Sequence, residues 1–149
     1  MLHLIGHYPI LGSTRVAFVD LGCGRGKALH VARRALPRAM IIGIDLVPSL
    51  LEDARKNVPT ATLLNSNVLE VDYKDMLRPF DAAVVFNKNS FDRETTRKTL
   101  ESIRGSASAV FYIYSNPVFE DLFARDECVF AMRGWHKNWN SRAYVLKPA

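Results

Sequence analysis

Short apolar, β-branched runs alternate along this chain with segments of helical periodicity, and this alternation restricts the fold more than any other feature. The strands that it predicts lie at 15–20, 40–45, 61–67, 81–87 and 107–116. Helices are predicted at 26–36, 48–58, 92–104 and 117–124, and a short helix or a loop at 68–78. Strands that alternate with helices in this way form a parallel sheet with helices on both faces.

The end of the chain breaks the alternation. Apolar stretches at 127–134 and 141–147 follow one another with no helical pattern between them. This direct succession predicts an antiparallel hairpin. The expected fold is therefore α/β: a three-layer, Rossmann-like arrangement around a seven-stranded, mostly parallel sheet. The length suits one ordinary domain, so we expect a single domain over 1–149.

Composition excludes several classes of protein. Hydrophobic residues make up 48% and charged residues 23%, close to globular averages, which argues against a disordered or fibrous chain. The net charge of +5 would suit an acidic partner such as nucleic acid, but a solvated basic surface is the preferred interpretation. The chain has neither an 18-residue apolar run nor a signal-peptide pattern. We therefore expect a cytoplasmic protein that does not enter a membrane.

The two cysteines, Cys23 and Cys128, are too few for a disulfide framework and lack the spacing of a zinc site. Both are expected to be reduced thiols, and no metal site is expected.

Unusual polar residues stand where four of the predicted strands end. In chain order they are Asp20, Gly22, Gly24 and Gly26; then Asp45; then Ser66 and Asn67; then Asn87, Lys88, Asn89, Ser90 and Phe91. Each group alone has a structural explanation, since glycines allow tight turns, acids cap helices and asparagines form turns. Parallel α/β sheets, however, bind ligands at the carboxyl ends of their strands. Four such groups on one edge therefore predict a pocket.

The spacing within "FVDLGCGRG" (18–26) narrows the class of ligand. A phosphate loop needs a hydroxyl residue after Gly-Lys, and here Ala28 follows Lys27. The dinucleotide fingerprint Gly-x-Gly-x-x-Gly also differs from the glycine spacing found here. Asp20 would repel a pyrophosphate and attract an ammonium group. The pattern therefore favours a nucleoside that carries a positive charge, and S-adenosylmethionine fits that description.

With these residues in view, the chain resembles class I S-adenosylmethionine-dependent methyltransferases. "VDLGCGRG" matches the first motif of that family and "IIGIDLVPSLLEDARKN" matches its second region, and the resemblance covers residues 15–149. More narrowly, the chain is similar to small bacterial-type members in which strand four leads into Asn-Pro-Phe and strand five into an Asn-Pro step. The corresponding stretches here are "NKNSFD" (87–92) and "YSNPVFEDL" (114–122), with Ser90 in place of the proline.

The resemblance implies roles for individual residues. Asp20 would contact the methionine amino group, and Asp45 would accept hydrogen bonds from both ribose hydroxyls. Leu46 would lie against the adenine and Asn67 would hydrogen-bond its edge. The full set implied for the cofactor is Asp20, Gly22, Cys23, Gly24, Gly26, Asp45, Leu46, Asn67 and Val68. The catalytic candidates are Asn87, Asn89 and Phe91. The cofactor would be S-adenosylmethionine, and the product S-adenosylhomocysteine.

The acceptor of the methyl group stays open among proteins, small molecules and nucleic acids, although the Asn89 carbonyl would suit an amine nitrogen. Family members usually carry helices before strand one that cover the cofactor, whereas the segment 1–14 is short. The resemblance thus leads us to expect that a partner or a second copy covers an exposed site.

A rival interpretation is a non-catalytic module that binds nucleic acid or protein on a methyltransferase fold. The loop "RGWHKNWNSR" (133–142) places Trp135 and Trp139 between cations, as a surface that stacks bases does. Packing of both tryptophans onto the sheet is the preferred interpretation of this loop. A nicotinamide-dependent oxidoreductase is disfavoured by the glycine spacing and by Asp20.

Overall fold

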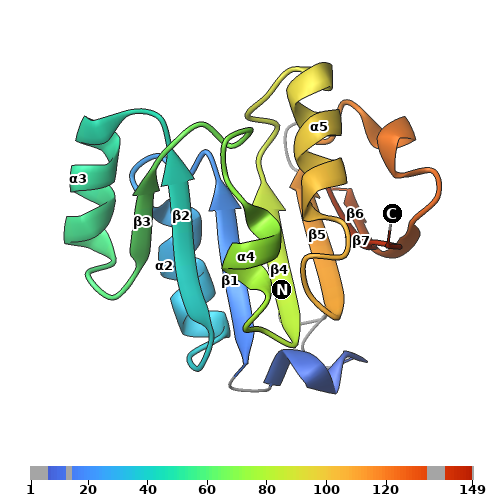
Figure 1. Ribbon diagram of the computed structural model, residues 1–149, viewed down its shortest axis with the longest axis horizontal. Coiled ribbons are helices and arrows are strands. Elements are labelled where there is room, and N and C mark those ends of the chain that lie inside the picture. Colours follow the sequence, from blue (N-terminus) through green and yellow to red (C-terminus); the bar gives the residue numbers. More distant parts are fainter. Residues whose placement is uncertain (1–6, 13–14, 134–139, 149) are drawn as a thin grey trace.

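The computed structural model describes residues 7–12, 15–133 and 140–148. A seven-stranded sheet forms its centre, with the order β3-β2-β1-β4-β5-β7-β6 (Figure 1). The strands are β1 Val16–Leu21, β2 Met40–Asp45, β3 Thr62–Asn65, β4 Ala82–Asn87, β5 Ala109–Ser115, β6 Glu127–Arg133 and β7 Asn140–Val145. Strands β1 to β5 pair in parallel, whereas β7 is antiparallel to both β5 and β6. The structure confirms the predicted fold class and the C-terminal hairpin.

Helices cover both faces of the sheet, as expected for parallel strands with apolar residues throughout. The elements are α2 Lys27–Ala35, α3 Pro48–Asn57, α4 Tyr73–Leu77 and α5 Arg93–Ile103, with 3₁₀ turns η1 Pro9–Gly12 and η2 Glu120–Phe123. Helices α4 and α5 lie in front of the sheet in Figure 1 and α2 lies behind it. The two faces accordingly hold separate hydrophobic clusters.

The helix boundaries follow from local residue chemistry. Pro48 occupies the first turn of α3, where its missing N–H costs no hydrogen bond. Asp92 caps α5, and its carboxylate accepts a hydrogen bond from the Thr95 backbone N–H at 2.8 Å. The prediction of a helix over 117–124 is wrong in extent. The structure has only the short 3₁₀ turn η2 there, over Glu120–Phe123. Its approach is bent by Asn116, which has a φ of +52° and whose N–H donates to the Asn140 carbonyl.

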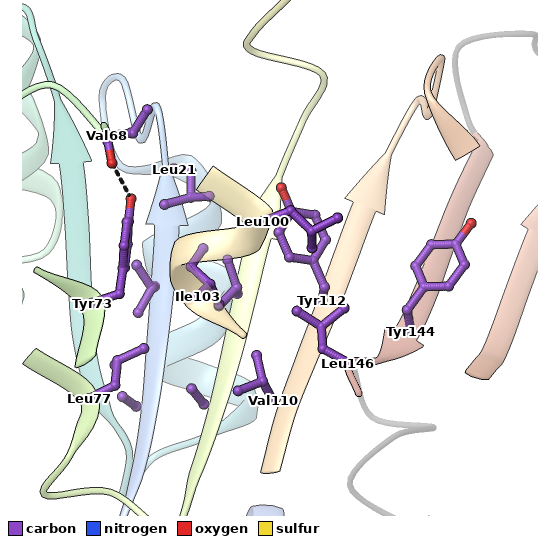
Figure 2. Close-up of a cluster of buried hydrophobic side chains, with 14 of the residues drawn as sticks. Leu21, Val68, Tyr73, Leu77, Leu100, Ile103, Val110, Tyr112, Tyr144 and Leu146 are labelled. Atoms are coloured by element: carbon purple, nitrogen blue, oxygen red, sulfur yellow. Dashed lines mark hydrogen bonds between the residues drawn. The ribbon is translucent and has the colours of Figure 1, made fainter. Parts of the chain in front are cut away.

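Aromatic residues of β5 and β7 fill much of the cluster under α4 and α5. Figure 2 shows Tyr112 and Tyr144 in this cluster, together with Leu100 and Ile103 of α5. Tyr112 is fully buried, and its hydroxyl points toward the carboxyl ends of β4 and β5. The cluster thus reaches the edge of the sheet at which a ligand is expected.

Gly43, in the middle of β2, lies where no side chain fits. A Cβ at this position would lie 2.8 Å from both Cys23 Sγ and Leu29 Cδ1. We expect Gly43→Ala to lower the free energy of unfolding by about 1–3 kcal/mol through overpacking. Urea denaturation measures this change, and Gly12→Ala is a control because a Cβ there would have no atom within 4 Å. Equal stability of the two variants would contradict the packing described here.

The prediction for the loop 133–142 extends beyond the described residues. Trp135 and Trp139 lie in 134–139, outside the described residues, so neither interpretation of that loop is tested. Within the ranges that the structure describes, no helix is long and apolar enough to cross a membrane. Both cysteines are free thiols, as predicted.

Candidate functional site

The strand order reverses between β1 and β4, which places the ligand edge of the sheet at their carboxyl ends. The parallel register sets Asp20 opposite Phe86 and Leu21 opposite Asn87. The residues that follow β1, β2, β3 and β4 therefore meet at one edge, as the sequence predicted. Two cavities lie along this edge, and Gly22 lines both of them.

The glycine loop between β1 and α2 has a conformation that side chains disfavour. Gly22, Gly24 and Gly26 have φ values of +73°, +52° and +80°, all in the left-handed region. The N–H groups of Gly22 and Cys23 donate to the Ile44 carbonyl at 2.9 and 3.0 Å, which anchors the loop to β2. The three glycines thus allow the backbone to adopt left-handed φ values at the ligand edge of the sheet.

Asp45 joins this loop to the end of β2. One carboxylate oxygen accepts from the Gly24 N–H at 2.8 Å and the other from the Val47 N–H at 2.9 Å. A carboxylate oxygen can accept more than one hydrogen bond, so each oxygen keeps capacity for a ligand hydroxyl. Asp45 is half-buried and lines the first cavity. Its carboxylate is therefore oriented by the protein and directed to a site where a diol could bind.

The first cavity has a volume of about 530 Å³. It brings together the predicted cofactor residues Gly22, Asp45, Leu46, Asn67 and Val68, together with Phe91, which was predicted to be catalytic. The loop after β3 is held in two places. The Asn67 side-chain carbonyl accepts from the Leu69 N–H at 3.0 Å, and the Val68 carbonyl accepts from the Tyr73 hydroxyl at 2.9 Å (Figure 2). Mixed apolar and hydrogen-bonding walls of this kind suit a nucleoside.

The second cavity has a volume of about 350 Å³ and lies on the α2 side of Gly22. Asp20 and Cys23 line it with the rings of Phe18 and Phe86, and Lys27 and Lys88 also line it. Asp20 is 3% exposed, and burial, with a smaller contribution from the charge of Asp45, raises its pKa to about 7. A cationic group that entered this cavity would favour the ionised carboxylate.

Cys23 lies beside Asp20 but is not an activated thiol. Burial, and then the charges of Asp20 and Asp45, raise the pKa of the Cys23 thiol to about 12. The neutral thiol therefore contributes shape and apolar surface to the cavity rather than a nucleophile.

The asparagines after β4 differ in exposure. Asn87 is fully buried, and its amide nitrogen donates to the Tyr112 hydroxyl at 3.1 Å while its oxygen accepts from the Ser90 N–H at 3.0 Å. Asn89 is exposed, has a φ of +50°, and accepts a hydrogen bond from the Tyr114 hydroxyl at 3.3 Å. It stands in the chain between Lys88 of the second cavity and Ser90 of the first. Their catalytic roles stay predictions.

Some lining residues were not predicted from the sequence. Thr95 of α5 reaches the first cavity, and Phe18 and Phe86 reach the second from the interiors of β1 and β4. The helix cap at Asp92 was a usable signal for Thr95, since it places the first turn of α5 next to the end of β4. The two phenylalanines carried no such signal, because each looks like an ordinary core residue.

Within the described part of the chain, no group of His, Cys, Asp and Glu could hold a metal ion.

Comparison with known proteins agrees with this arrangement. Residues 18–107 match the methyltransferase domain family. The trans-aconitate 2-methyltransferase of Afipia carboxidovorans is 38% identical over 65 residues, which are 44% of this chain and 25% of that protein. The tRNA1(Val) (adenine(37)-N6)-methyltransferase of Yersinia pestis is 43% identical over 51 residues, 34% of this chain and 20% of that protein. The chain thus matches about a quarter or less of the length of these curated relatives.

Solved structures share the fold along nearly the whole chain. Magnesium protoporphyrin IX methyltransferase from Synechocystis was solved with bound S-adenosylmethionine, and it matches this chain with a TM-score of 0.68 at 12% identity. The match covers 99% of this chain and 76% of that one. A TehB-like methyltransferase from Corynebacterium glutamicum has a TM-score of 0.64 at 17% identity, with 99% of this chain and 86% of that one covered. The chain belongs to the methyltransferase domain family, and specifically to the class I S-adenosylmethionine-dependent methyltransferases.

Proposed function

We propose that this chain transfers a methyl group from S-adenosylmethionine, with the adenosine of the cofactor in the first cavity and its methionine end in the second. One observation carries the proposal. Two carboxylates, Asp20 and Asp45, stand at the ends of neighbouring strands on either side of a glycine that lines both cavities. A ligand with a diol at one end and a cation at the other matches this arrangement.

The two carboxylates differ in a way that suits the two ends of the cofactor. Asp45 is oriented by backbone N–H groups and keeps acceptor capacity for neighbouring hydroxyls. Asp20 is buried, and a nearby ammonium would compensate the cost of its ionisation. The residues present therefore fit the cofactor of this family. Leu46 and Val68 would supply apolar contact to the adenine, and Asn67 a hydrogen bond to its edge.

When bound, the cofactor supplies a methyl group already activated by attachment to a sulfonium. The protein then has mainly to align the acceptor with that methyl group, and such alignment is worth about 7–11 kcal/mol in well-oriented reactions. Direct displacement needs no obligatory acid–base pair. Under this proposal the loop after β4 faces the acceptor, because it passes between the two cavities at Gly22.

We further propose an amine nitrogen as the acceptor. Asn89 is exposed at the end of β4, and its side-chain oxygen, already fixed by the Tyr114 hydroxyl, could accept a second hydrogen bond from an N–H group. The adenine-N6-methyltransferase relative is named for a nitrogen acceptor, and the trans-aconitate relative for a different one. The proposal therefore rests on Asn89 rather than on the relatives.

Replacing Asn89 by alanine tests this role. Loss of one positioned hydrogen bond of about 1 kcal/mol should slow turnover roughly five-fold while the dissociation constant of S-adenosylhomocysteine stays within about two-fold. Release of S-adenosylhomocysteine is measured with bulk tRNA and with small amines as acceptors, and the dissociation constant by calorimetry. Ser102→Ala, exposed near the C-terminal end of α5 and away from the ligand edge, is the control. Unchanged turnover in Asn89→Ala would remove this residue from the acceptor site.

The non-catalytic alternative makes a different prediction for the same protein. Tight binding of tRNA with a steep salt dependence, and no binding of S-adenosylmethionine, would support a nucleic-acid-binding module and contradict the proposed activity.

A further inference from the structure

The two cavities meet at Gly22, and Ser90 packs directly onto that meeting point. A Cβ at Gly22 would lie 3.1 Å from both the Cβ and the Oγ of Ser90, and 3.8 Å from the ring of Phe91. No ligand atom fits between Gly22 and Ser90 at such a separation, because two successive van der Waals contacts require about twice that distance. A ligand that lies against this face of Gly22 must therefore move Ser90 aside.

A hydrogen-bonded path from the core holds Ser90 in this position. The Ser90 N–H donates to the side-chain oxygen of Asn87 at 3.0 Å, and the Asn87 amide nitrogen donates to the Tyr112 hydroxyl at 3.1 Å. Asn87 and Tyr112 are both fully buried. An amide group donates only through nitrogen and accepts only through oxygen, so the Ser90 N–H requires the Asn87 oxygen. The Tyr112 hydroxyl accepts from the Asn87 nitrogen on the other side and so fixes the orientation of this amide.

The surrounding contacts confine any movement to a few residues. Beyond the loop, Asp92 is fixed as the cap of α5 by its hydrogen bond to Thr95. Before it, Asn87 is the last residue of β4 and pairs in register with Tyr114 of β5. Residues 88–91 are thus the segment that can move while both flanking elements stay in place. In Figure 2 the Tyr112 hydroxyl points toward this end of the sheet, and Tyr144 lies on a more distant strand.

We propose that Tyr112 is a positioning residue of the cofactor site: through Asn87 it holds Ser90 on Gly22, and a ligand extends from the first cavity into the second only when this contact opens. The inference rests on the proposed function, since it concerns a cofactor that spans both cavities. Adenosine alone fits within the first cavity and does not require the opening. S-adenosylhomocysteine spans both cavities and does.

The rate of ligand association tests this proposal with the full chain immobilised for surface plasmon resonance. Association of a ligand that needs a minor open form is proportional to the fraction of protein in that form. Loss of a hydrogen bond of about 1 kcal/mol in Tyr112→Phe should raise that fraction, and the association rate of S-adenosylhomocysteine, about five-fold. The association rate of adenosine should not change. A purely structural effect of the substitution would alter both ligands alike.

A second variant and a control keep the test decisive. Ser90→Gly removes the side chain that contacts Gly22 without altering the core, and it should raise the S-adenosylhomocysteine rate in the same direction. Tyr144→Phe removes a hydroxyl from the same hydrophobic cluster on β7 and should leave both rates unchanged. Should Tyr112→Phe not fold, Ser90→Gly still tests the opening at Gly22, and an unchanged S-adenosylhomocysteine rate in that variant would overturn the inference.

The outcomes separate this inference from the proposed function. If the wild-type protein binds neither adenosine nor S-adenosylhomocysteine, the proposed function fails and this inference with it. If the wild type binds both ligands but Ser90→Gly and Tyr112→Phe associate with S-adenosylhomocysteine at the wild-type rate, the positioning role of Tyr112 is overturned while the proposed function stands. Equal acceleration for adenosine and S-adenosylhomocysteine would also overturn it.

Discussion

Replacing Asp45 by alanine is expected to weaken the binding of S-adenosylhomocysteine at least about 100-fold. Hydrogen bonds to a charged group contribute about 1.5–3 kcal/mol each, and the proposed ribose diol would lose two of them, for a total near 3 kcal/mol or more. The substitution also releases the Gly24 and Val47 N–H groups that the carboxylate holds. The glycine loop then keeps only its bonds to the Ile44 carbonyl as links to the end of β2, and the loss at Gly24 weakens the site further.

Two comparison variants sharpen this result. Asp45→Asn keeps the shape and one carbonyl acceptor, so its affinity should fall between those of wild type and Asp45→Ala. Asp75→Ala removes an exposed carboxylate on α4 that pairs with Arg78, and it should bind like wild type. Calorimetric titration measures all three. An Asp45→Ala protein that binds within about three-fold of wild type would exclude the ribose site proposed here.

The affinity for S-adenosylhomocysteine is expected to depend on pH through Asp20. The pKa of this carboxyl is raised from 3.8 to about 7, chiefly by burial and secondly by the charge of Asp45. An ammonium ligand prefers the ionised form, so affinity should be full above pH 7 and fall about ten-fold per pH unit below it. Between pH 7, where about half of the carboxyl is ionised, and pH 5, where about 1% is, the loss reaches about 50-fold. Binding near pH 6 should also release close to one proton, which titrations in two buffers of different ionisation enthalpy detect.

Asp20→Asn separates the charge from the shape of this residue. The variant should bind weakly and with no pH dependence between pH 5.5 and 7.5, since the ionisable group is gone. A wild-type affinity that is constant over this range, or a variant that keeps the pH dependence, would show that Asp20 is not the group that meets the cation.

The same carboxyl links folding stability to pH in the opposite direction. Its pKa is higher in the folded state than in the unfolded chain, so its contribution to stability is full below about pH 4 and is lost as pH rises through 7. Relative to wild type, Asp20→Asn should therefore have the higher Tm at pH 8, and the difference should vanish near pH 4. Under the proposed function, the wild-type protein keeps at its ligand edge a buried charge that costs stability at neutral pH and would meet the ammonium group of the cofactor.

The fold could be predicted from the sequence because each element carries a local signal. Strands β1 and β4 are buried on both faces and therefore appear as continuous apolar runs. The hairpin was visible because 127–134 and 141–147 have no helical pattern between them. The helix predicted at 117–124 failed because Asn116 turns the chain with a positive φ and donates to Asn140 on another strand, a contact that no local pattern reveals.

Only the site residues that stand at the ends of strands could be predicted from the sequence. Parallel pairing brings Asp20, Asp45 and Asn67 to one edge whatever their neighbours are, so these residues could be grouped from the sequence. The Tyr112–Asn87–Ser90 path could not be foreseen, because it joins residues 25 positions apart through side-chain geometry. Phe91 lies in the first cavity because the cap at Asp92 fixes where α5 begins, and its position depends on that tertiary packing.

Calorimetric titration of the wild-type chain with S-adenosylhomocysteine at pH 7.5 tests the proposed cofactor site most directly. The geometry of Asp20, Gly22 and Asp45 predicts saturable binding at one site per chain, tighter than the binding of adenosine alone because the methionine end occupies the second cavity. No binding, or binding no tighter than that of adenosine, would contradict a cofactor site that extends across both cavities.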